Sequence, residues 1–261
     1  MSCLSGSSQN IDMIPDRQRV EYALKQLELQ TPNNGIGTYM ERSQHRFLKY
    51  CFEPDTSYHE VPCLGRVADI LREDTVTEIQ TSAFSAMREK LEVFLKQYNV
   101  TIVWPCVVKS RIVWINPESG DSALGPYRRN RMAVFRVLPE LLKISEYYGS
   151  ERLKVLAAQT VCDDKRLLDG YGPDRKKRCT KLDRVPTELC SVIDISSPDR
   201  IAELLPYNNG DELDRSDFQA RTGLKRRNLW CAVKFLEETG ILTQSRKNGN
   251  RIKYRFNDPR M

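Results

Sequence analysis

Two short runs of alternating residues, 66–71 and 76–81, each carry an acid where a half-buried strand would normally have an apolar residue. The four residues between them are enough for a tight hairpin connection. Asp69 lies in the first run, and Glu78 and Gln80 share one face of the second. Pairing of the runs would bring two carboxylates and an amide together. Because isolated buried carboxylates are costly, this hairpin predicts a site for a hard, oxygen-binding cation such as Mg²⁺. The alternative is a set of partly exposed acids on an edge hairpin.

Composition limits the class of protein. The chain has 261 residues, of which 40% are hydrophobic and 29% charged, which fits one large or two smaller soluble domains. Apolar stretches stay well short of the roughly 20 residues of a membrane helix, so no membrane partner is expected. The eight cysteines form no Cys-x-x-Cys pair and there are only two histidines, which disfavours a zinc finger. Scattered cysteines and the lack of a secretory signal predict a cytoplasmic location.

Apolar spacing predicts an α/β core with a mixed sheet in the N-terminal half. The expected elements are helices over 15–30, 36–51 and 84–98, strands near 58–62, 66–71, 76–81 and 100–108, and a strand over 111–115 after a turn at Lys109 and Ser110. Further along, a helix over 137–148 and a strand over 153–161 are expected, and the polar stretch 163–183 predicts a loop.

The C-terminal part is basic. From Arg215 to Met261 there are 12 Lys/Arg and 4 Asp/Glu, a balance of +8, so the remainder carries −2 of the net +6. Helices over 198–205, 214–222 and 225–239 are expected, with Ser216 as the cap of the second, followed by strands over 241–245 and 251–256 joined by a turn over 247–250. This charge asymmetry favours contact with nucleic acid.

This order resembles a winged helix-turn-helix domain over about the last sixty residues, and Thr222-Gly223-Leu224 and Gly240-Ile241-Leu242 carry the resemblance. A recognition helix docks its N-terminal residues in the major groove, and a wing contacts phosphates. The expected DNA-binding residues are Arg226, Arg227, Trp230 and Lys234 on the helix, and Arg246, Lys247, Arg251 and Lys253 on the wing. A winged helix used for protein contacts is the alternative, and a core or dimer-contact role for Trp230 stays open.

The order of Glu41 in a helix, Asp69 in one strand and Glu78-x-Gln80 in the next resembles the PD-(D/E)XK nuclease superfamily, which includes restriction endonucleases and Holliday junction resolvases. The resemblance implies that Asp69, Glu78 and the backbone carbonyl of Ile79 ligate Mg²⁺, with Mn²⁺ as a substitute. It also implies that Glu41 assists the metal or the attacking water. Gln80 stands where the family usually has lysine; an amide can orient water but brings no positive charge. His45 and His59 could lie nearby, although each is expected to be a structural or surface residue.

The implied organisation has four parts. Residues 1–34 are an N-terminal helical segment, 35–127 a restriction endonuclease-like core with a mixed sheet flanked by helices, 128–197 a middle region of uncertain fold, and 198–261 a winged-helix DNA-binding domain. The implied function is Mg²⁺-dependent hydrolysis of DNA phosphodiester bonds by an endonuclease. A catalytically inactive, nuclease-like DNA-binding regulator and a scaffold that binds neither metal nor DNA are the alternatives. DNA is the expected partner, and a homodimer would supply the two sites that cutting two strands requires.

Overall fold

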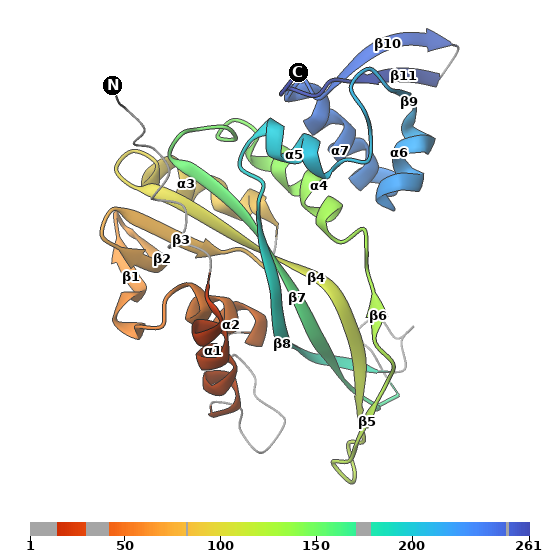
Figure 1. The fold of residues 1–261 in the computed structure, drawn as a ribbon. Coiled ribbons are helices and arrows are strands. Elements are labelled where there is room, and N and C mark those ends of the chain that lie inside the picture. Colours follow the sequence, from red (N-terminus) through yellow and green to blue (C-terminus); the bar gives the residue numbers. More distant parts are fainter. Residues whose placement is uncertain (1–14, 30–41, 82, 171–178, 249–250) are drawn as a thin grey trace, which may run out of the picture.

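A computed structural model of the chain describes residues 15–29, 42–81, 83–170, 179–248 and 251–261, without the side chains of 248 and 251. A large mixed sheet forms its centre, with strand order β1-β2-β3-β4-β7-β8 and with β5 and β6 attached to β4 (Figure 1). The strands are β1 (His59–Cys63), β2 (Arg66–Arg72), β3 (Thr75–Ile79), β4 (Asn99–Ile115), β5 (Ser122–Leu124), β6 (Arg128–Arg129), β7 (Leu153–Leu167) and β8 (Thr180–Asp194).

Strand directions in this sheet are mixed. Strands β1, β2 and β3 form an antiparallel meander, and β3, β4 and β7 run parallel to one another. Strand β8 returns antiparallel to β7. The predicted α/β class with a mixed sheet flanked by helices is therefore confirmed. Residues 128–197, for which the sequence predicts no definite fold, contribute β7 and β8 to the same sheet as β1–β4.

Strand β4 runs unbroken from Asn99 to Ile115, so the turn predicted at Lys109 and Ser110 is wrong. A shift in its register against β7 between Val107 and Lys109 marks a bulge there instead. The polar residues continue as strand because β7 supplies partners: Arg111 Nε lies 2.8 Å from Asp163 Oδ1 across the pair. The loop predicted over 163–183 is also wrong at both ends, because residues 163–167 continue β7 and residues 180–183 begin β8. Residues 171–178 lie outside the described residues.

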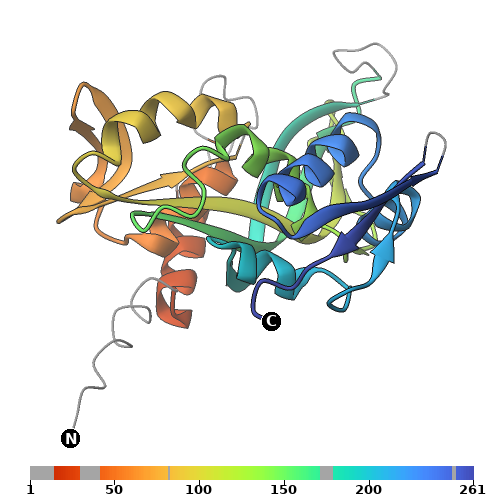
Figure 2. The same cartoon turned by 90° about the horizontal axis from the view of Figure 1, so that it is seen from above.

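Helices cover both faces of the sheet (Figure 2). Helices α1 (Arg17–Leu29) and α2 (Ser43–Phe52) pack on the face to which Ile79, Val103 and Ala158 point. The opposite face carries η2 (Phe84–Met87), α3 (Arg88–Phe94), η3 (Val134–Val137), α4 (Leu138–Leu141) and η4 (Leu142–Ile144). A further short 3₁₀ turn, η1 (Thr56–Tyr58), precedes β1. The continuous helices predicted over 84–98 and 137–148 are therefore broken into α and 3₁₀ turns. Of the helix predicted over 36–51, residues 36–41 lie outside the described part.

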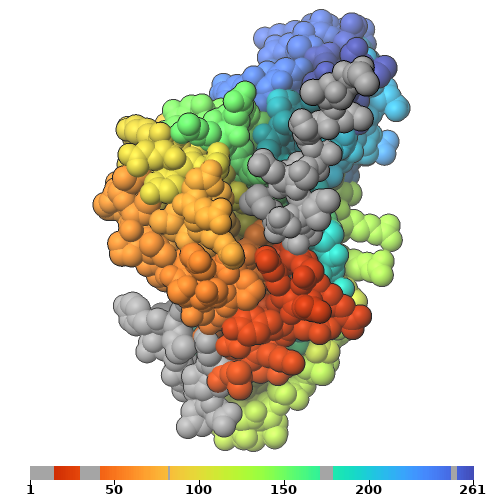
Figure 3. All heavy atoms as spheres, turned by 60° about the vertical axis from the view of Figure 1, so that its left-hand side comes forward, coloured from red at the N-terminus to blue at the C-terminus, as the bar shows by residue number. Residues whose placement is uncertain are grey.

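The C-terminal elements are α5 (Pro198–Leu204), β9 (Glu212–Leu213), α6 (Arg215–Thr222), α7 (Arg226–Glu238), β10 (Leu242–Asn248) and β11 (Arg251–Phe256). Strands β10 and β11 form a hairpin, and β9, which the sequence did not predict, pairs with β11. Helix α6 begins with a capping box of Asp214 and Asp217, so the predicted cap Ser216 is wrong; its backbone N–H donates to Asp214 Oδ1 at 2.8 Å. In Figure 3 this blue C-terminal part lies at one end of the molecule.

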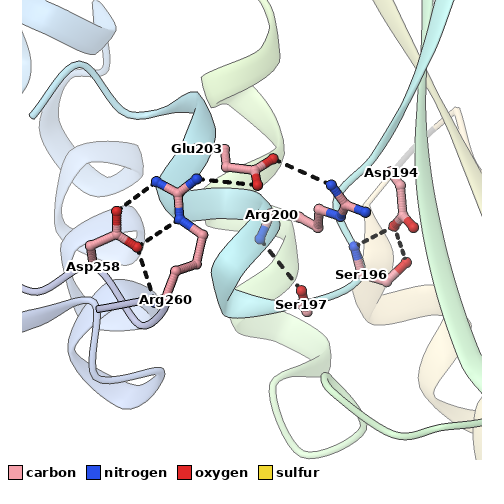
Figure 4. A network of polar contacts seen from close by, with 7 residues as sticks. All are labelled: Asp194, Ser196, Ser197, Arg200, Glu203, Asp258 and Arg260. Carbon is pink, nitrogen blue, oxygen red and sulfur yellow. Dashed lines mark hydrogen bonds and ion pairs between the residues drawn. The ribbon is translucent and has the colours of Figure 1, made fainter.

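The C-terminal part is joined to the sheet by apolar and polar contacts. Tyr148 and Phe235 meet edge to face, with ring centroids 5.0 Å apart, within a hydrophobic cluster common to both parts. A polar network also joins the end of β8, α5 and the C-terminal residues (Figure 4). There Arg260 contacts both Asp258 and Glu203, at 2.5 and 3.3 Å. No helix among the described residues has the length and apolar character needed to span a membrane.

Candidate functional site

The two acidic strands meet where their pairing ends. Strands β2 and β3 pair from Arg72–Thr75 to Ile70–Thr77, and beyond that point the backbone ladder stops. The side chain of Asp69 fills the gap: its Oδ2 accepts the backbone N–H of Ile79 at 2.7 Å. The backbone N–H of Asp69 in turn points at Glu78 Oε1, 3.4 Å away. We call this place, formed by Asp69 and Glu78 with their contacts His45 and Lys90, the fork site.

Glu78 is the most buried acid of the fork site, with 2% of its surface exposed. Lys90 lies on α3, which packs on the face of the sheet opposite to α2, and its Nζ donates to Glu78 Oε2 at 2.7 Å. Burial and the neighbouring charge of Asp69 nevertheless raise the pKa of Glu78 to about 7, against the lowering effect of Lys90. Glu78 can therefore gain or lose a proton near neutral pH.

Asp69 behaves in the opposite way. Burial alone would raise the pKa of Asp69, but a hydrogen bond from His45, the charge of His45 and the Ile79 N–H together lower it below its usual value. The His45 Nε2 atom, on α2, lies 3.0 Å from Asp69 Oδ2. Two neighbouring carboxylates whose pKa values are moved apart are typical of sites that hold a cation or transfer protons.

The structure therefore brings the predicted residues Asp69 and Glu78 together. The Ile79 carbonyl faces the strand of Asp69: Gln80 N–H donates to the Val103 carbonyl in β4 at 2.9 Å, so by alternation the N–H and C=O of Ile79 face β2. The Gln80 side chain donates to the Ala83 carbonyl at 2.9 Å, within its own connection to η2. Glu41 lies outside the described residues.

Two members of the fork site, Lys90 and His45, were not predicted as site residues. Lys90 gives no sequence signal, because a lysine beside the apolar stripe of a helix is usually solvated. His45 is predicted as a structural or surface residue, yet it contacts a site carboxylate. Its counterpart His59 contacts the backbone carbonyl of Glu53 at 2.8 Å and is structural.

The donor atoms of the fork site suit Mg²⁺ in kind. Two carboxylates and a backbone carbonyl are hard oxygen donors, and Mg²⁺ usually completes its shell with water. Within the described ranges, however, no group of three or more His, Cys, Asp or Glu side chains is arranged to hold a metal ion. The ammonium of Lys90 neutralises Glu78 in this structure. A metal would therefore take over, or share, the carboxylate that Lys90 contacts.

The second predicted site is the exposed face of α7. Leu229, Val233 and Leu236 of α7 are buried against the C-terminal core. The four predicted helix contacts all lie on the exposed side: Arg226, Arg227, Trp230 and Lys234. Trp230 is 48% exposed, so it is not a core residue of the described chain.

The wing cations are less available than the sequence indicates. Arg246 pairs with Glu212 at 2.8 Å, and Lys253 pairs with Asp214 at 3.2 Å. On α7, Lys234 pairs with Glu238 at 3.3 Å. Among the described residues, Arg226, Arg227 and Lys247 have no ion-pair partner, and the side chain of Arg251 lies outside the described part.

Fold and site together define a mixed α/β domain with a buried carboxylate pair and a basic C-terminal module. Residues 42–196 match a family described as "Domain of unknown function (DUF8091)", and the chain belongs to this family. The match extends from the start of α2 to just beyond β8, so it contains the sheet and the fork site. The chain is 27% identical over 229 residues to an uncharacterized protein of Treponema pallidum (strain Nichols), covering 86% of this chain and 88% of that protein. No solved structure matches.

The raised pKa of Glu78 predicts a specific dependence of stability on pH. A carboxyl whose pKa is higher in the folded state stabilises the fold below its unfolded pKa, near 4.5, and loses this contribution as pH rises to about 7. We expect the unfolding free energy of the wild type, relative to Glu78→Gln, to fall by about 1–3 kcal/mol over this window. Asp69 does not interfere, because its lowered pKa places its effect below the window.

Urea denaturation at several pH values between 4.5 and 8 measures this difference. Parallel pH profiles of the wild type and Glu78→Gln would contradict the assignment.

Proposed function

We propose that this protein is a metal-dependent DNA endonuclease of the PD-(D/E)XK type, which hydrolyses phosphodiester bonds at the fork site. The observation that carries the proposal is the meeting of Asp69 and Glu78, buried and with pKa values moved apart, where β2 and β3 separate. Structural carboxylates are seldom buried as a neighbouring pair unless cations compensate them.

The order of elements supports the same proposal. Helix α2, the antiparallel strands β1–β3, helix α3 and the parallel strand β4 follow the order that the resemblance implies. In the C-terminal part, the order α5, β9, α6, α7, β10, β11 is the helix and hairpin order of a winged helix, with β9 as its small third strand. These agreements concern topology, and the proposed chemistry rests on the fork site.

Each residue of the fork site has a distinct proposed role. Asp69, Glu78 and the Ile79 carbonyl would hold Mg²⁺, or Mn²⁺ in its place; the bound ion supplies polarisation of the scissile phosphate and activation of a water. Lys90 provides the positive charge that Gln80 lacks, because its ammonium already lies at the carboxylate pair. His45 donates to Asp69 and so orients this carboxylate.

DNA affinity is assigned to the exposed face of α7. Arg226, Arg227 and Trp230 lie at its N-terminal end and are exposed, which suits the docking of a recognition helix in the major groove. Lys247 would add a phosphate contact from the wing. The paired cations Arg246 and Lys253 would contribute only after leaving their carboxylates, so we expect their share of the affinity to be smaller.

One observation favours a second candidate, a catalytically inactive nuclease-like regulator that only binds DNA. The Gln80 amide is engaged with the Ala83 carbonyl, and Lys90 already neutralises Glu78. If Lys90 permanently occupied the place of the metal, the protein would keep the nuclease-like fold but would not hydrolyse DNA.

The catalytic proposal predicts that the wild type cuts plasmid, linear or branched DNA with Mg²⁺ or Mn²⁺. Asp69→Asn/Glu78→Gln should reduce cutting at least about 100-fold, because it removes the ligand charges. Lys90→Ala should also reduce the rate strongly, whereas Lys96→Ala, which removes an exposed lysine just beyond the same helix, should not. Rates are measured by gel electrophoresis of labelled DNA. Equal residual cutting by the wild type and the double variant would rule out catalysis by the fork site, and intact DNA binding without cutting would favour the regulator.

The DNA-binding proposal predicts a steep loss of affinity with rising salt, because binding releases counterions from the phosphates. Arg226→Ala/Arg227→Ala should weaken binding and reduce the log–log salt slope by about 2 if both contact phosphate. The matched control Lys25→Ala/Lys96→Ala removes two exposed charges, one on α1 and one just beyond α3, and should leave the slope unchanged. Fluorescence anisotropy at several salt concentrations gives these slopes. A flat salt response of the wild type would contradict the proposal.

A further inference from the structure

A cavity of about 270 Å³ lies between the start of α2 and the far ends of β7 and β8. Five cationic side chains line it, namely Arg42, Lys165, Arg166, Lys181 and Arg184, and we call it the basic pocket. Two acids, Asp164 and Asp183, also line it, so the charged lining sums to +3 (five positive and two negative charges). None of these residues belongs to the fork site or to α7.

Both acids of the basic pocket are already engaged. Asp164 Oδ1 accepts from Arg184 Nε at 2.6 Å, and Asp183 Oδ2 accepts from the Ser43 hydroxyl at 2.5 Å. The remaining cations have no such partner: within the described ranges, Arg42, Lys165, Arg166 and Lys181 form no ion pair. Four unpaired positive charges around one cavity repel each other unless an anion enters it.

Arg166 carries the clearest sign of a missing acceptor. Its guanidinium stacks over the Trp114 ring, 5.9 Å from the ring centroid, which holds it at the wall of the pocket. Its Nε atom is buried and has no hydrogen-bond partner in the described part of the chain. A buried guanidinium N–H without a partner is costly, because it has lost its hydrogen bond to water and has no protein acceptor in exchange. An anionic oxygen in the pocket would satisfy it.

Two residues of the pocket wall adjoin fork-site segments along the chain. Gln44, in its wall, directly precedes His45, and Thr81 directly follows Gln80. Helix α2 starts here, with Ser43 and Gln44 buried and without a side-chain cap from Arg42. The partial positive charge of a helix N-terminus adds to that of the four cations. A strand of nucleic acid at the fork site would therefore pass or end next to the basic pocket.

We propose that the basic pocket binds the terminal phosphate of a nucleic-acid strand. A terminal phosphomonoester carries about −1.5 to −2 charges at pH 7, more than the single charge of an internal phosphodiester, and it presents three acceptor oxygens. This matches a cavity with several unpaired donors and a net positive lining. The phosphate part stands on the pocket alone, whereas the nucleic-acid part rests on the proposed function. Free nucleotides share the same chemistry and are distinguished by the test.

The test uses the full chain in EDTA, so that its outcome does not depend on metal or cutting. The probes are single-stranded oligonucleotides of one sequence that carry a 5′-phosphate, a 3′-phosphate or only hydroxyl ends, with adenosine monophosphate as a competitor. The pocket variants are Arg166→Gln/Lys181→Gln and, because Arg166 is half-buried, a second pair of exposed cations, Arg42→Gln/Lys181→Gln. Lys25→Gln/Lys96→Gln is the control with the same charge change. Fluorescence anisotropy gives each Kd.

We expect the wild type and the control to bind one phosphorylated form about tenfold or more tightly than the hydroxyl form. Both pocket variants should lose this preference, while Asp69→Asn/Glu78→Gln should keep it even if the nuclease assay fails. Equal Kd values for all three oligonucleotides in the wild type, or an unchanged preference in both folded pocket variants, would overturn the proposal. Displacement by adenosine monophosphate at the concentration of the phosphorylated oligonucleotide would overturn its strand-end part.

Discussion

The burial of two neighbouring carboxylates at the fork of β2 and β3 is the constraint on which the functional part of the structure depends. Asp69 and Glu78 would repel each other and lose hydration if they were left alone. The compensating groups come from three separate elements: His45 from α2, the Ile79 N–H from β3 and Lys90 from α3. The site exists only when both helical layers are docked on the sheet, so the fold and the site form together.

The same sheet connects this site to the other charged regions. Strands β4 and β7 extend beyond the helical layers (Figure 1), and the far ends of β7 and β8 form the basic pocket. On the opposite face, α4 and η4 pack against the C-terminal part, whose α7 presents its unpaired arginines to solvent. Two positively charged features, the basic pocket and the exposed face of α7, thus belong to the same chain as the acidic fork site.

The sequence predicted those features that depend on residues close together in the chain, and it failed for those that depend on residues far apart. Alternation within two short runs was enough to predict the hairpin and the meeting of Asp69 with Glu78, because both depend on neighbouring residues. The turn predicted at Lys109 was wrong because the strand is completed by charges on β7, such as Asp163, about fifty residues away in the chain. Strand β9 has only two residues and forms only through its pairing with β11.

The role of Lys90 shows the same limit at the site. Its charge is aimed at Glu78 only after α3 has docked, so neither helical spacing nor local motif identifies it. The cap of α6 was predicted wrongly for a different reason. Both Asp214 and Ser216 are residue types that cap helices, but only Asp214 has an acid three residues later, Asp217, whose carboxylate accepts the backbone N–H of Asp214 and completes a capping box. The basic pocket likewise assembles residues from α2, β7 and β8.

Metal binding at the fork site is measured most directly by anomalous scattering from crystals soaked in Mn²⁺, with Glu78 ionised at a pH above 7. We expect a peak at the fork site, where Asp69, Glu78 and the Ile79 carbonyl would hold the ion, with Lys90 displaced from Glu78 Oε2. A fork site without a peak at saturating Mn²⁺, in which the Lys90–Glu78 pair persists, would contradict this expectation.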